Sequence, residues 1–166
     1  MTEIHNYFKA EKNESLVFVI VGATAILCGF YFLLVINSKF FNGLSWPLIF
    51  IAIIQIFVGI IIFFRSPTDE KRVTNFAQNS PKNIKNLEII RMDKVMTKFK
   101  LYRYAEIGLA LLGLILFLAA SPTGFWRGVG LGIIIQAGIM LLADSFAENR
   151  GHHYLEFLKA TFGEKI

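Results

Sequence analysis

The sequence contains only one cysteine, Cys28, and three histidines among 166 residues. A single cysteine excludes an intramolecular disulfide, and neither CxxC nor a Cys/His zinc spacing occurs. Cys28 lies within an apolar run, a setting that disfavours the reactive thiolate. A Ser/His/Asp order, a glycine-rich phosphate loop and a paired-carboxylate motif cannot be recognised either. We therefore expect no catalytic centre of a familiar type, no cofactor and no metal.

Charged residues are also scarce, at 17% of the chain against 55% hydrophobic residues. The mean hydropathy is +0.55, and the apolar residues are gathered in long runs instead of being spread among polar ones. A soluble domain of this length needs more polar surface, so the composition favours a bilayer environment. The basic residues lie mainly in one segment between apolar runs, which topology explains better than nucleic-acid binding does.

Four apolar runs indicate membrane-spanning helices, because about 20 helical residues cross about 30 Å of hydrocarbon. The third run is short, but Leu101, Tyr102 and Tyr104 can extend its helix into the membrane interface. A proline in the first turn begins the second run, Arg65-Ser66-Pro67 ends it, and Ser121-Pro122-Thr123-Gly124 is a tight turn between the last two. The sequence therefore predicts an all-α integral membrane protein whose spans form two hairpins. The four runs are Leu16–Ile36, Trp46–Phe64, Ile107–Ala120 and Trp126–Ala143.

The orientation follows from the lysine and arginine residues, of which the chain has seventeen. Fifteen of them, Lys165 included, flank the runs on one side, whereas the two short loops hold only Lys39 and Arg127. This asymmetry predicts that both termini and the central segment are cytoplasmic. The expected organisation is a cytoplasmic segment 1–15, a hairpin 16–64, a cytoplasmic basic segment 65–104, a hairpin 105–144 and a cytoplasmic helix 145–166.

The central segment contains an amphipathic basic helix that follows Ser80-Pro81, an expected N-cap and first helical residue. Its apolar residues share one face of the helix, and its basic residues lie on the other. We expect this helix to lie on the inner leaflet, with its basic side chains on anionic lipid headgroups. The alternative is a helix packed on the bundle. The apolar face contains Met92, Val95, Met96, Phe99 and Tyr102, and the basic one contains Arg91, Lys94 and Lys98.

Two glutamines, Gln55 and Gln136, are the strongly polar side chains near the middle of the spans. A buried amide in hydrocarbon needs a hydrogen-bond partner, so we expect the two to bond to each other or across a dimer. The alternative is that they line a polar pathway. The spacing Gly128-x-x-x-Gly132 predicts a face where another helix backbone can approach closely.

Charged residues gather where the third and fourth spans reach the cytoplasm. Antiparallel neighbours would bring these ends together, so we expect an ion pair between one of the arginines and one of the acids. A proton-coupled site is the alternative, since partial burial favours a protonated carboxyl. The candidate residues are Arg103, Glu106, Asp144, Glu148 and Arg150.

Acidic and histidine residues recur every fourth position from Asp144 through Glu148 and His152 to Glu156, which would place them on one helix face. Such a stripe could hold a metal ion. Gly151 could end the helix, however, and the di-iron motif needs Glu-x-x-His, whereas the chain has Glu148-x-x-x-His152 and no second copy. The stripe therefore does not lead us to expect a metal site.

The residues Asp144 to Tyr154 form the pattern D-x-x-A-E-x-R-x-x-x-Y directly after a span that contains a glutamine. This pattern resembles the end of a group of small, uncharacterised four-helix proteins of the bacterial inner membrane, over about a quarter of the chain. The resemblance implies a location and no activity. We expect a structural or accessory subunit of a homo-oligomer or larger membrane complex; the alternatives are a small transporter or channel, and third a membrane enzyme.

Overall fold

The computed structural model describes residues 2–163, and within this range the chain is helical almost throughout, with no strand. The expected all-helical fold is confirmed. Two short π-helical stretches interrupt the α-helices. In chain order the elements are α1 (Thr2–Tyr31), η1 (Phe32–Ile36), α2 (Lys39–Asn79), α3 (Pro81–Asn83), η2 (Ile84–Ile89), α4 (Ile90–Ala119) and α5 (Phe125–Phe162).

Four continuous helical stretches are long and apolar enough to cross a membrane, and they comprise 35, 41, 39 and 38 residues. At about 1.5 Å per residue each measures roughly 50 to 60 Å. A bilayer has a hydrocarbon core of only about 30 Å, so each stretch is long enough to extend more than about 20 Å beyond it. The helices are therefore considerably longer than the apolar runs that identified them.

The expected helix boundaries at Pro47, Pro67 and Gly151 are wrong, because all three residues lie inside helices. Pro67 has no N–H, so α2 lacks one backbone hydrogen bond at this point. The helix nevertheless continues, because its next turns are held by packing: Asp69 and Val73 are buried against neighbouring helices. Gly151 is buried in α5, where a Cβ atom would meet the Met96 side chain. Tertiary packing thus continues both helices through residues that usually end them.

Helix α3 begins at Pro81 as predicted, but the Ser80 side chain makes no capping hydrogen bond. Helix α5 continues without a break from the expected fourth span to Phe162. The last residues of the expected segment 145–166, Lys165 among them, lie outside the described residues.

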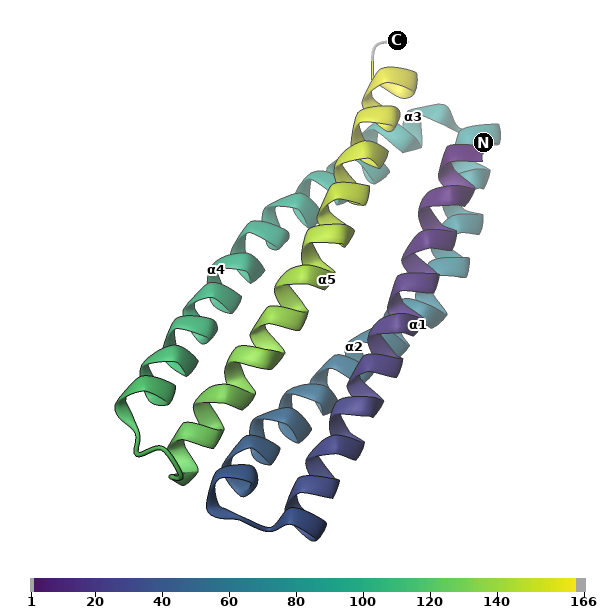
Figure 1. The fold of residues 1–166 in the computed structure, drawn as a ribbon. Helices are drawn as coiled ribbons and strands as arrows, with labels where there is room; N and C mark the ends of the chain where they lie inside the picture. Colours follow the sequence, from purple (N-terminus) through teal and green to yellow (C-terminus); the bar gives the residue numbers. More distant parts are fainter. Residues whose placement is uncertain (1, 164–166) are drawn as a thin grey trace.

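The four long helices lie side by side in the order α1, α2, α5, α4 (Figure 1). The turn between η1 and α2 and the turn between α4 and α5 lie at one end of the molecule, and the described N- and C-terminal ends lie at the other. Helix α1 also contacts α5, so α2 and α5 form the centre of the assembly. This order brings the turn that precedes α2 next to the start of α5.

Glycines allow the helix backbones to approach closely in the apolar part of the molecule. A Cβ atom at Gly128 would overlap the Phe40 carbonyl oxygen, and one at Gly132 would lie 2.7 Å from the Leu44 carbonyl oxygen. Between α4 and α5, a Cβ at Gly113 would lie 2.9 Å from the Gly130 carbonyl oxygen. The predicted close approach at Gly128 and Gly132 is confirmed, and its partner is α2.

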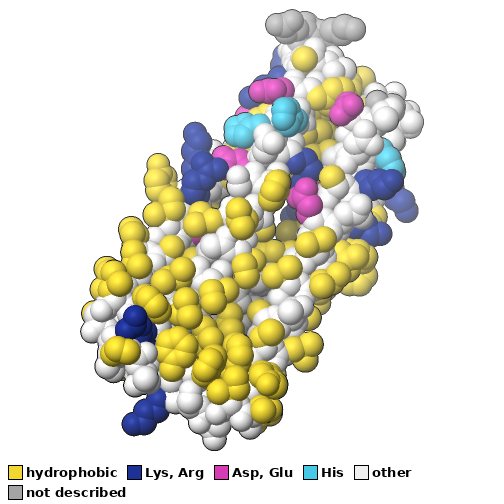
Figure 2. Space-filling model, viewed as in Figure 1, with side chains coloured by type: hydrophobic (Ala, Val, Ile, Leu, Met, Phe, Trp, Pro, Cys, Tyr) yellow, Lys and Arg dark blue, Asp and Glu magenta, His cyan; other side chains and the backbone are white. Residues whose placement is uncertain are grey.

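The largest cluster of buried hydrophobic residues lies at the opposite, charged end. Figure 2 shows hydrophobic side chains covering the end with the two turns, whereas charged and histidine side chains gather toward the end with the termini. The charged parts of the helices that continue beyond the apolar runs, called the helix extensions, therefore pack around a hydrophobic core of their own. The buried members are Ile4, Tyr7, Phe8, Val73, Ile84, Ile89, Met92, Met96, Tyr154, Leu155 and Leu158.

Candidate functional site

The charged ends of α4 and α5 are joined by an ion pair between Arg103 and Glu148. Glu148 is buried, while nearly half of the Arg103 side chain is exposed. His152 lies one turn further along α5, with its Nε2 3.7 Å from the second Glu148 oxygen. This pair is one of those expected from the sequence, and it ties the two helices together at the boundary of their apolar segments.

Arg150 does not join this pair. Its guanidinium contacts Glu14 of α1 and lies over the Tyr7 ring, 5.4 Å from the ring centroid. Burial lowers the pKa of Arg150, although an arginine keeps its charge at neutral pH. Arg150 thus links α5 to α1, a contact that the sequence does not reveal because it depends on which helices are neighbours.

Glu106 and Asp144 face each other across the contact between α4 and α5. Glu106 is 4% exposed, and its Oε2 has no hydrogen-bond partner among the described residues. Asp144 is partly buried. The two acids lie on neighbouring helices, as the sequence predicts, but neither forms a salt bridge with an arginine in the described part of the chain.

A second polar group, between α1 and α2, was not expected from the sequence. The Ser66 hydroxyl donates to the Glu11 carboxylate at 2.5 Å, and Arg65 contacts both Glu11 and Asp69, at 3.3 and 3.2 Å. Both acids are buried, so their charges need these partners. The sequence predicts that Arg65-Ser66-Pro67 ends the second span, so it does not indicate Arg65 and Ser66 as partners of an acid on α1.

Glu88 is the most deeply buried acid of the helix extensions, and it accepts two hydrogen bonds from Arg91, at 2.6 and 2.9 Å. Arg72 of α2 lies 3.8 Å away, and the Tyr154 hydroxyl donates to Glu88 at 3.4 Å. Burial alone would lower the pKa of Arg91, but the ion pair with Glu88 outweighs this and raises it. Glu88 thereby connects η2, α2, α4 and α5.

Tyr154 also stacks on Tyr7, with ring centroids 4.0 Å apart and an angle of 11° between the rings. Burial raises the pKa of Tyr7 to about 12, helped by the negative charge of Glu11. It raises the pKa of Tyr154 as well, together with the charge of Glu88. These two rings fasten α1 to α5 within the buried hydrophobic cluster.

The basic amphipathic helix forms the first part of α4, and its apolar face is covered by protein. Met92 and Met96 are buried in the hydrophobic cluster, and Val95 and Phe99 pack against it. The expectation that this face lies on the lipid leaflet is therefore wrong for these residues. Helix α5 continues far enough for Tyr154, Leu155 and Leu158 to pack in the same cluster. Lys94 and Lys98 are exposed, and their contact with lipid headgroups stays a prediction.

The two mid-span glutamines are buried, but they do not bond to each other. Gln55 Nε2 donates to the Phe18 carbonyl oxygen of α1 at 2.8 Å, and Gln136 Nε2 donates to the Leu48 carbonyl oxygen of α2 at 3.0 Å. A backbone carbonyl oxygen can accept two hydrogen bonds, so Phe18 and Leu48 can each accept the glutamine N–H as well as the backbone N–H of their own helix. Each glutamine thus connects its own helix to a neighbouring backbone.

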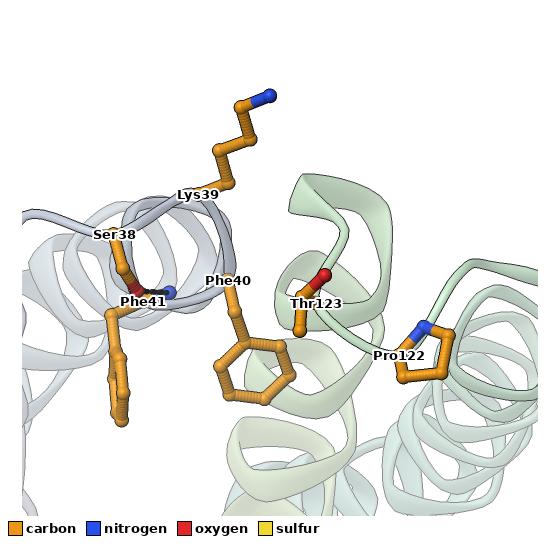
Figure 3. Close-up of a pocket in the computed structure, with 6 residues that line it drawn as sticks. All are labelled: Ser38, Lys39, Phe40, Phe41, Pro122 and Thr123. Atoms are coloured by element: carbon orange, nitrogen blue, oxygen red, sulfur yellow. Dashed lines mark hydrogen bonds between the residues drawn. The ribbon is translucent and has the colours of Figure 1, made fainter.

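One hollow lies away from these polar groups, and a second lies beside Glu88 and its arginines. The larger, with a volume of 490 Å³, lies between the two turns and is lined by Ser38, Lys39, Phe40, Phe41, Pro122 and Thr123. In Figure 3, Phe40 points toward the space between the turns, while Lys39 points away from it. The smaller measures 230 Å³ and lies beside η2, where its arginines are already paired with acids.

The stripe on α5 does not converge on a metal-binding cluster. Within residues 2–163 no three histidine, cysteine or acidic side chains lie close enough to hold an ion. No family model, no curated protein and no solved structure matches the chain.

Proposed function

We propose that this protein is a structural or accessory subunit of the bacterial inner membrane, present as a homo-oligomer or within a larger membrane complex. Its four helices cross the bilayer as two hairpins, and both termini lie in the cytoplasm. The asymmetric distribution of lysine and arginine supports this orientation.

One observation carries the proposal: both glutamines of the apolar region use their amide nitrogens as links between helices, while neither Oε1 has a hydrogen-bond partner among the described residues. A polar pathway needs side chains that face a shared space and exchange partners with a solute. Gln55 and Gln136 instead donate to carbonyl oxygens of two different helices, α1 and α2. These hydrogen bonds contribute about 0.6 kcal/mol each to holding the helices together.

The helix extensions support a role in assembly. They bury a hydrophobic core and the acidic partners of several ion pairs, which favours a stable surface outside the bilayer. Acidic side chains are preferentially buried there, whereas Lys94, Lys98 and Lys100 are exposed. This outward positive charge suits anionic lipid headgroups, which attract basic residues by about 1 kcal/mol each near the surface.

The proposal is tested by the access of water to the glutamines. In a Cys28→Ser background, Gln55→Cys and Gln136→Cys are each treated with a small hydrophilic thiol reagent, with the exposed Thr123→Cys as a positive control. We expect the control to react and the two buried positions not to react. Reaction at both glutamine positions would favour the alternative, a small transporter or channel with a polar path.

Assembly is tested separately by the mass of the tagged protein extracted from its native membrane in mild detergent. A subunit predicts a complex of defined size well above the 18.8 kDa of one chain. A monomer at every detergent concentration that keeps the chain folded would contradict the proposal.

A further inference from the structure

Glu106 carries a buried carboxyl oxygen without a partner. The residue is 4% exposed, and its Oε2 makes no hydrogen bond within the described part of the chain. An ionised carboxylate in such a position loses its hydration and gains nothing in return, which is among the costliest arrangements in a folded protein. The carboxyl therefore needs either a cationic partner or a proton.

The side chain that faces Glu106 is a second acid. Asp144 approaches from α5: Glu106 lies between Arg103 and Gly113 on α4, and Asp144 lies between their α5 partners Glu148 and Gly130, so the antiparallel helices bring the two acids to the same level. The other charged group that influences both acids is Arg103, one turn before Glu106 on α4. Arg103, however, is held by Glu148. Arg150, the other arginine of this region, is held by Glu14 and the Tyr7 ring. The structure thus brings two carboxyls together while Arg103, the arginine that influences both, binds another acid.

We propose that Glu106 and Asp144 form one proton-binding site, which holds a single proton between a Glu106 oxygen and an Asp144 oxygen. The O–H of one carboxyl donates to the ionised oxygen of the other, which gives a short, charge-assisted hydrogen bond and a net charge of −1. The proton is taken from solvent and returned to it, and no other bond changes. This site goes beyond the proposed function and does not depend on it.

The proton makes the contact between α4 and α5 dependent on pH. In the unfolded chain both carboxyls lose their protons near pH 4. The folded pair retains one proton above this pH, so the folded state binds more protons than the unfolded state. Stability therefore falls as the pH rises, until the folded pair has also lost its proton. Beyond that point two negative charges face each other and push the two helices apart.

The first test measures unfolding in detergent against pH for the wild type, Glu106→Gln and Asp144→Asn. An amide in either position donates a hydrogen bond permanently, so both variants should lack the part of the pH dependence that belongs to the pair. Glu156→Gln is the matched control, because Glu156 lies exposed on the same helix and should leave the wild-type curve unchanged. A wild-type curve that is parallel to those of both variants would overturn the proposal.

Infrared spectroscopy provides a direct readout of the proton, through the C=O stretch of a protonated carboxyl group. We expect this band in the wild type at neutral pH and its loss in both Glu106→Gln and Asp144→Asn. A wild type without the band would show two ionised acids and refute the site. A band that persists in Asp144→Asn would mean that Glu106 is protonated by burial alone, which would refute a shared proton.

Discussion

A single methyl group on α5 should distinguish close helix packing from contact with lipid. We consider Gly132→Ala, at the crossing of α2 and α5, and Gly138→Ala, six residues further along the same helix. A Cβ atom at Gly132 would lie 2.7 Å from the Leu44 carbonyl oxygen and 3.2 Å from the Pro47 Cβ atom. A Cβ atom at Gly138 would meet nothing within 4 Å.

The magnitude follows from these distances. Ordinary contacts need about 3.5 Å, so the two backbones must separate by somewhat less than about 1 Å around Gly132. Neither a helix backbone nor a proline ring can yield as a flexible side chain does, and such overpacking costs about 1 to 3 kcal/mol. Replacing glycine by alanine in a helix also gains up to about 1 kcal/mol at either position. This gain cancels in the comparison, so Gly132→Ala should be about 1 to 3 kcal/mol less stable than Gly138→Ala.

The free energy of unfolding in detergent micelles, measured under the same conditions for both variants, gives this difference directly. Disulfide cross-linking between α2 and α5 in each variant checks that the helices have kept their order. Equal stability of the two variants would refute the packing described for Gly132 and with it the close crossing of α2 and α5.

Two further predictions concern the charged end. Glu148→Gln should lower the free energy of unfolding by about 1 kcal/mol, because half of the Arg103 side chain is exposed and its charge is screened by solvent. A double-mutant cycle with Arg103→Gln should show a coupling energy of similar size. Full additivity of the two substitutions would mean that the pair contributes nothing. The pKa of the Tyr7 hydroxyl is about 12 in the folded protein and about 10 in the unfolded chain. Burial of the neutral hydroxyl therefore contributes fully to stability below about pH 10, and this contribution is lost as the pH rises toward about 12. Tyr7→Phe should therefore flatten the alkaline unfolding curve between about pH 10 and about pH 12, and an unchanged slope would contradict the burial of this hydroxyl.

The number of long helices follows from the sequence, and so does the gathering of charged residues at one end of the bundle. Long apolar runs leave few alternatives to helices that could span a bilayer, and the position of each charged residue relative to its run indicates which charges lie near one another. This is why an ion pair between α4 and α5 could be anticipated, although not that Arg103 and Glu148 would form it. The length of the helices could not, because Pro67 and Gly151 normally mark helix ends, and only contacts with other helices reveal that they do not.

The partners of the polar side chains were harder to predict, since they depend on which helices are neighbours. Gln55 and Gln136 bond to backbone carbonyl oxygens, which every residue has and which leave no trace in a sequence. Arg150 contacts Glu14 because α1 lies beside α5, and either arginine of the region was an equally good candidate for Glu148. Helix periodicity correctly identified the apolar face with Met92 and Met96, but it could not say whether lipid or protein covers it.

The proposed function requires one arrangement: four helices cross the bilayer, with both turns outside and the extended, charged ends in the cytoplasm. Cysteine labelling of intact cells with an impermeant reagent tests it most directly, with Thr123→Cys in the turn before α5 and Asn79→Cys at the end of α2, both exposed and both in a Cys28→Ser background. We expect Thr123→Cys to be labelled from outside and Asn79→Cys only after the cells are permeabilised. Labelling of Asn79→Cys in intact cells, with protection of Thr123→Cys, would contradict the orientation and the cytoplasmic placement of the packed core.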